Sequence, residues 1–328
     1  MPLIKAEGLS KTFKIYKRGD GIKGYLKSFI KRDYEEVDAV QDLDLKINEG
    51  EMIGYIGSNG AGKSTTVKML TGVLEPTFGK IKVNNRDPHD ERKKNAMDIG
   101  VVFGQKTQLW WDLPVKESFK LLKEIYEVSD EEFEDRIDEF DEVLQLSDFW
   151  NQPVRKLSLG QKMRCELAAA FLHHPKIVYL DEPTIGLDVA VKERIRDFIK
   201  KMNRNKNITV MLTTHDIGDI EDLCDRVVVL DEGKKIYDGG LDSLVDQFTS
   251  RRLIMDIRNG EDFSIEMEGI KHVKKDDGSI EIVFDREVIS ASDLMREVLN
   301  RYDVLDFQIR EPDIESVVKK VYNKGLEA

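Results

Sequence analysis

The sequence has few cysteines and no long apolar runs. Its two cysteines, Cys165 and Cys224, each lie in an apolar-periodic stretch, which indicates reduced, buried thiols rather than a disulfide framework or a metal pair. No apolar run reaches the roughly 18 residues that a membrane span requires. The N-terminus also lacks a charged and then apolar leader, so we expect a chain that neither crosses a bilayer nor enters a secretory route.

Positive charge is in deficit as well. Lys and Arg number 51 against 63 Asp and Glu, which gives a net charge of −12. This balance disfavours binding to nucleic acid through overall charge, and we expect no nucleic-acid partner. A chain of this length can bury the core of one main domain of roughly 200 to 250 residues and of a smaller second one.

The rest of the chain is organised around a glycine-rich loop. The loop lies between an apolar run, Met52 to Ile56, and a helical pattern that ends near Gly72. It reads, with the start of the helix, Gly57, Ser58, Asn59, Gly60, Ala61, Gly62, Lys63, Ser64 and Thr65. Glycines let the backbone N–H groups curl inward, and the helix dipole adds a positive end. We therefore expect a phosphate-binding loop in which Lys63 reaches the β- and γ-phosphates and Ser64 binds Mg²⁺.

A second apolar run, Ile177 to Leu180, ends in two acids, Asp181 and Glu182. At the carboxyl end of its strand, Asp181 is placed to complete the Mg²⁺ shell that Ser64 begins. Glu182 can orient and polarise a water for attack on the γ-phosphate. Two acids before Pro183 can also be a helix N-terminus, but that interpretation leaves the preceding apolar run unexplained. Together with the loop, the pair predicts a nucleotide hydrolase.

Strands and helices alternate through most of the chain. This order predicts an α/β fold with a mainly parallel, covered sheet. Loose alternation at 3–9 predicts an edge strand that leads to Phe13, and the alternation at 40–47 predicts an antiparallel strand. Residues 86–94 read as a charged connector. The stretch of about 106–172 predicts a helical insertion in which Ser129 and Glu132 have the spacing of a capping box.

Near residue 250 the pattern changes. Strand-like and helical stretches then alternate in a way that predicts a small α+β domain over 250–328, of ferredoxin-like type, after a main domain over 1–245. The strand-like stretches are 253–257, 264–267, 280–284 and 305–309, and the helical ones are 291–302 and 314–322.

A basic segment interrupts the acidic chain. From Lys14 to Arg32 there are seven Lys or Arg against one Asp. Apolar residues recur at helical spacing between the lysines, at Ile22, Tyr25, Leu26, Phe29 and Ile30. This insertion of about 14–36 fits a surface helix with a solvated face, and it equally fits a helix at a membrane surface or against a membrane partner.

Taken in order, these motifs resemble the nucleotide-binding subunits of ABC transporters over residues 3–245. Ser158, Leu159, Gly160 and Gln161 are similar to the family signature, which usually has a second glycine where Leu159 stands. Ser158 and Gln161 also have capping-box spacing. The resemblance implies a P-loop NTPase of ABC type with an antiparallel β subdomain and a helical subdomain, using ATP and Mg²⁺. It further implies a head-to-tail dimer in which the signature of one copy completes the ATP site of the other.

The same resemblance implies roles for four further residues. Gln105 looks like the loop glutamine that meets both the metal and the transmembrane partner, and His215 like the switch histidine that contacts the γ-phosphate. Asp188 lies in the loop that faces the second subunit. Phe13 looks like the aromatic that stacks on adenine, although it also fits a hydrophobic residue of an edge strand.

Two adjacent tryptophans, Trp110 and Trp111, stand in a loop beside Asp112. Either ring can belong to the core, but two neighbouring rings in a loop are hard to bury together. We therefore expect them to contact a membrane partner.

The preferred interpretation is an ATPase at the cytoplasmic face of the cell membrane that drives export through separate permease subunits. The chain looks like the ABC-2 exporter-type group, whose ATPases carry a small C-terminal domain ending in a motif similar to Glu311-Pro312-Asp313-Ile314-Glu315. The basic insertion also resembles one in ATPases that export cell-surface polysaccharides. A soluble ATP-driven clamp acting on a ribosome or DNA is the alternative of another class, but such proteins usually join two nucleotide domains or insert coiled coils.

Overall fold

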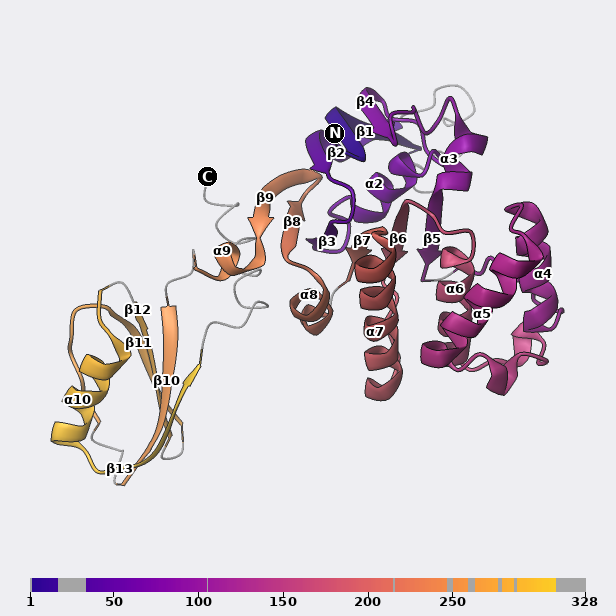
Figure 1. Ribbon diagram of the computed structural model, residues 1–328. Coiled ribbons are helices and arrows are strands. Elements are labelled where there is room, and N and C mark those ends of the chain that lie inside the picture. Colours follow the sequence, from indigo (N-terminus) through magenta and orange to yellow (C-terminus); the bar gives the residue numbers. More distant parts are fainter. Residues whose placement is uncertain are drawn as a thin grey trace, which may run out of the picture. The chain divides into compact units, whose positions relative to one another are not determined.

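The computed structural model describes residues 2–16, 34–104, 106–214, 216–246, 250–258, 263–276, 279–285 and 288–310. The chain divides into two compact units, Met1–Asp238 and Gly239–Ala328. Figure 1 labels the elements of both.

A six-stranded sheet forms the centre of the first unit. Its order is β5-β6-β7-β3-β8-β9, and the pairs from β5 to β8 are parallel. The strands are β5 Ile99–Phe103, β6 Ile177–Asp181, β7 Thr209–Thr213, β3 Met52–Gly57, β8 Arg226–Asp231 and β9 Lys234–Gly240. Nearly every residue of β3, β6, β7 and β8 is buried, as expected for parallel strands covered on both faces. The fold class predicted from the sequence is therefore confirmed.

A three-stranded antiparallel sheet of order β2-β1-β4 lies on one side of this core. Its strands are β1 Ile4–Tyr16, β2 Tyr34–Ile47 and β4 Phe78–Val83. The prediction of an edge strand at 3–9 is wrong, because β1 pairs with β2 on one side and with β4 on the other. Helix α2, Lys63–Leu70, buries Val67, Met69 and Leu70 in a hydrophobic core shared with both sheets. Figure 1 shows α2 between them. Helix α2, which follows the phosphate loop, is thus held between the two sheets.

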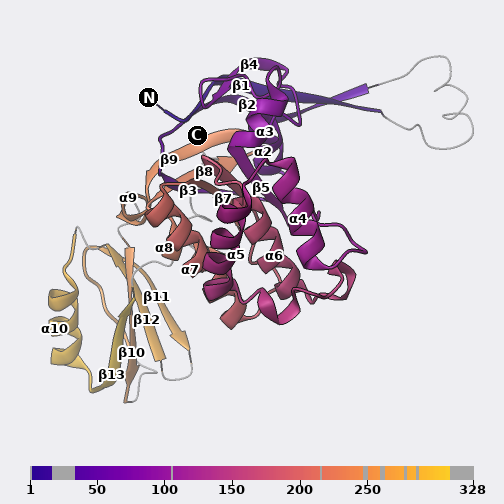
Figure 2. The same cartoon turned by 45° about the vertical axis from the view of Figure 1, so that its right-hand side comes forward.

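The first two strands run further than the alternation at 3–9 and 40–47 predicts. Beyond it they continue as a two-stranded ribbon, in which Phe13 pairs with Val37 and Tyr16 with Tyr34. Figure 2 shows the ribbon projecting from the sheet. Its side chains are largely exposed, so no buried face imposes a readable alternation. The amphipathic helix predicted within the basic insertion lies outside the described residues.

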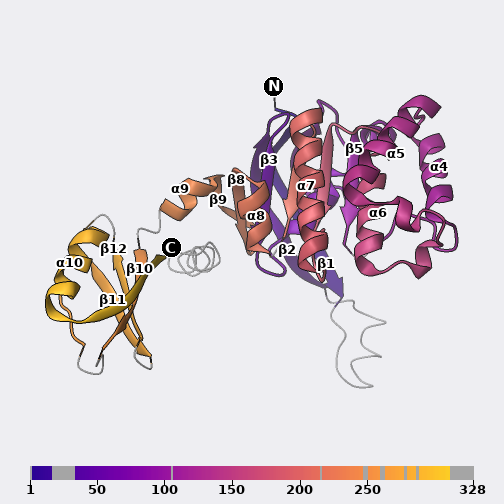
Figure 3. The ribbon, with the colours of Figure 1, turned by 60° about the horizontal axis from the view of Figure 1, so that its bottom comes forward.

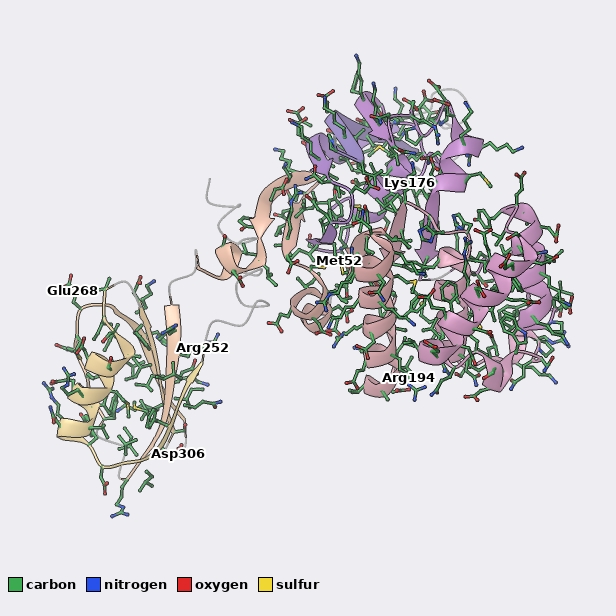
Figure 4. All side chains as sticks on the ribbon, viewed as in Figure 1. Met52, Lys176, Arg194, Arg252, Glu268 and Asp306 are labelled. Atoms are coloured by element: carbon green, nitrogen blue, oxygen red, sulfur yellow. The ribbon has the colours of Figure 1, made fainter. Side chains whose placement is uncertain are left out.

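Three helices cover the side of the central sheet that faces away from the antiparallel sheet. They are α6 Leu159–Phe171, α7 Val189–Lys206 and α8 Ile217–Leu223, and Figure 3 shows α7 running along the strands. The predicted helical insertion contains α4 Val115–Ile125 and α5 Asp130–Leu144, with short 3₁₀ turns at Ser147–Phe149 and Val154–Lys156. The predicted capping box of α5 is present in both directions between Ser129 and Glu132. Arg194 of α7, labelled in Figure 4, donates to Gln145 just after α5.

The prediction of a charged connector over residues 86–94 is wrong in part. The charged stretch 86–94 leads into a helix, α3 Arg92–Asp98, in which Asn95 is the buried residue. Since this helix presents no apolar stripe, its periodicity could not be recognised.

The second unit contains an antiparallel sheet of order β11-β12-β10-β13. Its elements, after the short helix α9 Leu241–Asp246, are β10 Ser250–Ile257, β11 Ile270–Asp276, β12 Ser279–Asp285, α10 Ala291–Arg301 and β13 Val304–Arg310. With β10 between β12 and β13, the strand order is ferredoxin-like. Helix α10 buries Leu294, Met295 and Val298 against this sheet.

Two predictions for this unit differ from the structure. The expected strand 264–267 is an extended stretch without ladder pairing, whose Phe263 and Ile265 are buried in the domain core. An unpredicted strand, β11, follows it at the sheet edge, rich in exposed lysine and therefore without apolar alternation. The expected helix 314–322 lies outside the described residues.

Within the described part of the chain, no helix has the length and apolar character to cross a membrane.

Candidate functional site

The phosphate loop takes its shape from glycine at two positions. Gly60 and Gly62 have φ angles of 87° and 97°, in the left-handed region that glycine adopts without strain. At Gly62 a Cβ atom would lie 2.3 Å from the carbonyl oxygen of Ala39 in β2, so a larger residue cannot fit. The Thr66 hydroxyl donates to the Gly62 carbonyl over 3.1 Å and ties the loop to the first turn of α2.

Lys63 lies folded back over this loop. Its Nζ donates to the carbonyl oxygens of Gly57 at 2.7 Å and Ser58 at 3.1 Å. The side chain is nearly buried, and this burial lowers the pKa of the amine, while the nearby Glu182 and Asp181 carboxylates act in the opposite direction. Two backbone carbonyl oxygens therefore hold the Lys63 amine at the loop.

The end of β6 brings a carboxylate to the loop. Ser64 Oγ donates to Asp181 Oδ2 over 3.3 Å, and the Thr213 hydroxyl at the end of β7 donates to Asp181 Oδ1. Mg²⁺ prefers such hard oxygen ligands and in nucleotide sites takes few protein groups together with phosphates. Among the described residues no cluster of three or more His, Cys, Asp or Glu could hold a metal alone. The Ser64 hydroxyl and the Asp181 carboxylate are oxygen donors of this kind and fit Mg²⁺ shared with a nucleotide.

Glu182 follows with an unusual backbone conformation. Its φ is 55°, a left-handed value that is uncommon for a residue with a side chain. The Glu182 N–H donates to the Thr213 carbonyl over 2.9 Å, which holds the turn beside β7. The residue lines an open cleft of about 580 Å³ together with Asn59, Ser64, Lys68 and Asp181. The proposed water-polarising carboxylate thus borders the same space as the phosphate loop.

Two residues predicted at this cleft, Gln105 and His215, lie outside the described residues, but their neighbours are placed. Gly104 donates its N–H to the Asp181 carbonyl over 3.0 Å, and it lines the cleft. Thr214 directly follows β7 and is buried. Both flanking positions therefore lie at the carboxyl edge of the central sheet.

The signature residues begin helix α6 and do not line that cleft. Ser158 and Gln161 form a complete capping box, in which the Gln161 N–H donates to Ser158 Oγ over 3.2 Å. Ser158 is exposed, and a Cβ at Gly160 would lie 3.3 Å from Val191 of α7. Asp188 caps α7 by accepting from the Val191 N–H over 2.9 Å. This exposed turn is accessible to another molecule.

Phe13 and the tryptophan pair are accessible too. The ring of Phe13 on β1 is about one-third exposed, with Lys11 Nζ 5.5 Å from its centroid. Trp110 and Trp111 are 39% and 54% exposed, so the expectation that they are not both buried is confirmed. Their loop is fixed by the N–H of Arg155, which donates to the Trp111 carbonyl over 3.0 Å.

A buried carboxylate that sequence reasoning missed anchors the same loop to α6. Glu166 accepts hydrogen bonds from the Thr107 hydroxyl and from the Gln108 N–H. Burial raises the pKa of this carboxyl group, while these hydrogen bonds act against the shift. Its only sequence signal is an acid among the apolar residues of α6. The segment after Gln105 is thus bound to the helix that begins with the signature.

The family model described as ABC transporter matches residues 40–185. The chain is 34% identical to the ABC transporter ATP-binding protein NatA of Bacillus subtilis over 66% of this chain and 88% of NatA. It is 28% identical to the linearmycin resistance ATP-binding protein LnrL of the same species over 90% of this chain and 97% of LnrL. The methionine import ATP-binding protein MetN of Geobacillus kaustophilus is 37% identical over 62% of this chain and 60% of MetN.

Solved structures agree with these relatives. A dimeric ATP-binding cassette in a post-hydrolysis state, bound to ADP and Pi, superposes with a TM-score of 0.60 at 29% identity, covering 73% of this chain and 98% of that one. CbiO1 from Clostridium perfringens, part of the ABC transporter complex CbiONQ, gives a TM-score of 0.59 at 28% identity, covering 76% of this chain and 94% of that one.

Proposed function

This chain belongs to the ATP-binding proteins of ABC transporters and is an ATPase, and from that premise we propose that it drives export through separate permease subunits. The observation that carries the catalytic part of the proposal is the meeting of Ser64, Asp181 and Glu182 beside the phosphate loop. In each working site, we propose that residues from one copy bind ATP and residues from a second copy close over it.

The hydrolytic step follows from the side chains of the cleft. Lys63 and the loop N–H groups hold the phosphates, and Phe13 stacks on adenine. Ser64, Asp181 and Gln105 are the residues that would hold Mg²⁺, which when bound neutralises charge on the β- and γ-phosphates. Glu182 orients a water and accepts its proton as the water oxygen bonds to the γ-phosphorus and the bond to the ADP oxygen breaks. His215 contacts the γ-phosphate.

Closure of the site requires a second copy. Ser158 is exposed and Gly160 is half-buried at the start of α6, where a helix N-terminus attracts phosphate. Asp188 begins α7 next to the same turn. Their accessibility supports a head-to-tail dimer with ATP between the phosphate loop of one copy and the signature of the other.

Replacing Ser158 by alanine separates its two proposed roles. Loss of the N-cap should lower the free energy of unfolding by about 1 kcal/mol. Loss of the hydroxyl at the phosphates should also weaken ATP-dependent dimerisation about tenfold, because a hydrogen bond to a charged group contributes about 1.5 kcal/mol. Urea unfolding and analytical ultracentrifugation with ATP measure the two effects.

The matched control is Ser129→Ala, which removes the complete capping box of α5, one of the helices that the structure describes. It should lower stability by a similar amount and leave dimerisation unchanged. Equal dimerisation of both variants would remove Ser158 from the interface.

The exporter assignment rests on the C-terminal unit as well as on the ATPase. We propose that residues 250–328 form an accessory domain that follows an ATPase domain over 1–245. The match to the linearmycin resistance ATP-binding protein LnrL extends over 90% of this chain and 97% of LnrL, which supports an ATPase with this additional domain. The second candidate is a cell-surface polysaccharide exporter, because the basic insertion resembles one in ATPases that export such polysaccharides.

We place the protein at the cytoplasmic face of the membrane, held there by two surfaces. One is the loop of Trp110 and Trp111, for a permease segment. The other is the basic stretch 14–32, where each lysine near an anionic surface contributes about 1 kcal/mol.

Both surfaces can be tested by membrane association. Trp111→Ala should lower recovery of a multi-span membrane protein from detergent extracts at least tenfold, because truncating a tryptophan at the centre of an interface costs about 2 kcal/mol of binding free energy or more.

Replacing Lys23, Lys27 and Lys31 by Glu should reduce flotation with vesicles that contain phosphatidylserine.

The controls are Phe78→Ala, which removes another exposed aromatic ring, and vesicles of neutral lipid. Unchanged recovery of the membrane protein would exclude the tryptophan loop from the permease contact. Unchanged flotation would leave the basic stretch as an ordinary surface segment. Recovery of ribosomes or DNA in place of a membrane protein would favour the soluble clamp.

A further inference from the structure

A fully buried carboxylate lies behind the proposed catalytic site. Asp219 of α8 has no solvent-exposed surface. Both Nε and a terminal nitrogen of Arg196 lie 2.7 Å from its Oδ1. Its Oδ2 accepts from the Thr214 hydroxyl over 3.1 Å and from the Thr184 hydroxyl. A buried charge is tolerated when it is paired and hydrogen-bonded in this way.

Each partner of Asp219 belongs to a different segment of the site. Thr184 is two residues after Glu182, and Thr214 directly precedes His215. Arg196 comes from α7, whose N-cap is Asp188. One carboxylate therefore joins the segment of the water-polarising residue, the segment of the switch histidine and the helix that follows the dimer-facing loop.

Further bonds tighten the segment around position 215. The Thr214 hydroxyl, while donating to Asp219, accepts from the Asp216 N–H over 2.9 Å. The Asp216 carboxylate accepts from the Gly218 N–H over 3.0 Å and pairs with Lys192 of α7. Residues 214 and 216 are thus both fixed, one on each side of the histidine.

We propose that Asp219 is a positioning residue for ATP hydrolysis, which holds the segment of Glu182, through Thr184, against the end of β7, through Thr214, without touching the nucleotide. The inference rests on the function proposed above. Asp219 does not line the cleft at the phosphate loop, whereas its partners Thr184 and Thr214 line a neighbouring pocket with Glu182. The network therefore acts on the hydrolytic step and leaves the phosphate-binding loop alone.

The negative charge is needed because every partner donates. A carboxylate offers two acceptor oxygens, one facing Arg196 and one facing the two threonines. In Asp219→Asn, one of these oxygens becomes an NH₂ group. If the NH₂ group faces Arg196, two donors meet and the arginine must move; if it faces the threonines, both hydroxyls must turn to accept and their present bonds are lost. Displacements near 1 Å at reacting groups cost roughly 100-fold in rate.

The test compares Asp219→Asn with Asp222→Asn in the full chain. Asp222 lies on the same helix and is 43% exposed. It pairs with Lys200 at 2.7 Å and reaches Arg196 only at 4.0 Å, whereas Asp219 lies 2.7 Å from that arginine. For Asp219→Asn we expect kcat for ATP to fall at least about tenfold with KM within threefold of wild type. Asp222→Asn should keep both values. If Asp219 served stability alone, the variant would show a smaller fraction of active protein and a lower melting temperature, and the kcat of each active molecule would not fall.

A second pair of variants keeps the test valid if Asp219→Asn does not fold. Thr184→Val removes one bond to the carboxylate, and Thr184→Ser restores the hydroxyl, so kcat should fall in the first and recover in the second. Unchanged kcat in Asp219→Asn and Thr184→Val, with an active wild type, overturns the positioning role alone. A folded wild type that binds ATP without hydrolysing it overturns the proposed function and this role with it.

Discussion

Glu182→Gln is expected to lower the rate of ATP turnover by about 100-fold or more while the protein still binds ATP. The amide keeps the shape of the side chain but cannot accept a proton from the attacking water, and general-base catalysis contributes roughly 10²- to 10⁴-fold. The groups that hold the phosphates, Lys63 and the loop N–H groups, are unchanged. We therefore expect a dimer trapped with ATP, detectable by phosphate release and by size-exclusion chromatography with Mg²⁺ and ATP.

A control variant for this experiment is Glu131→Gln. Glu131 is exposed in the first turn of α5 and borders no part of the cleft. It should turn over ATP at the wild-type rate and dimerise only transiently. If Glu182→Gln behaved like this control, the carboxylate would have no part in activating water.

Lys63→Ala should abolish productive ATP binding. The change removes the charge that is proposed to meet the β- and γ-phosphates, and charged hydrogen bonds contribute about 1.5–3 kcal/mol each. Two such bonds correspond to an affinity loss of roughly 100-fold or more. It also leaves the carbonyls of Gly57 and Ser58 without their present donor. Isothermal titration calorimetry with ATP and Mg²⁺ measures the affinity.

Lys80→Ala serves as the comparison, since Lys80 is an exposed lysine of β4. Its affinity for ATP should equal that of the wild type. A Lys63→Ala protein that bound and hydrolysed ATP normally would contradict the assignment of the phosphate loop.

The parts of the fold that the sequence predicts are those in which one local pattern suffices. A buried strand, the glycine loop and the helix after it are consecutive in the chain, and they are consecutive in space as β3, loop and α2. Both capping boxes, at Ser129 and Ser158, depend on a spacing of three residues, and both are present.

Other parts depend on contacts that no local pattern records. Strand β11 is an edge strand whose exposed lysines hide any alternation, and helix α3 buries an asparagine instead of an apolar stripe. The extended stretch with Phe263 and Ile265 alternates like a strand, but it forms no ladder. In each case, neighbours distant in sequence decide the structure.

The candidate site divides in the same way. Asp181 and Glu182 are predictable because a buried strand delivers them to the sheet edge. The role of Asp219 depends on Thr184, Thr214 and Arg196, which come from separate loops and helices. The sequence carries only a faint signal for it, an acid on the apolar side of a short helix.

The burial of both cysteines has a practical consequence for experiments on closure. Cys165 and Cys224 are free thiols, buried in the protein, and burial raises the pKa of each. Only thiolates react readily with maleimide dyes, so the native thiols should resist labelling. A single exposed substitution, such as Lys80→Cys, then places one dye on each copy of an otherwise unaltered chain. Energy transfer between the two dyes can follow ATP-driven approach of the copies in real time, without first removing any native residue.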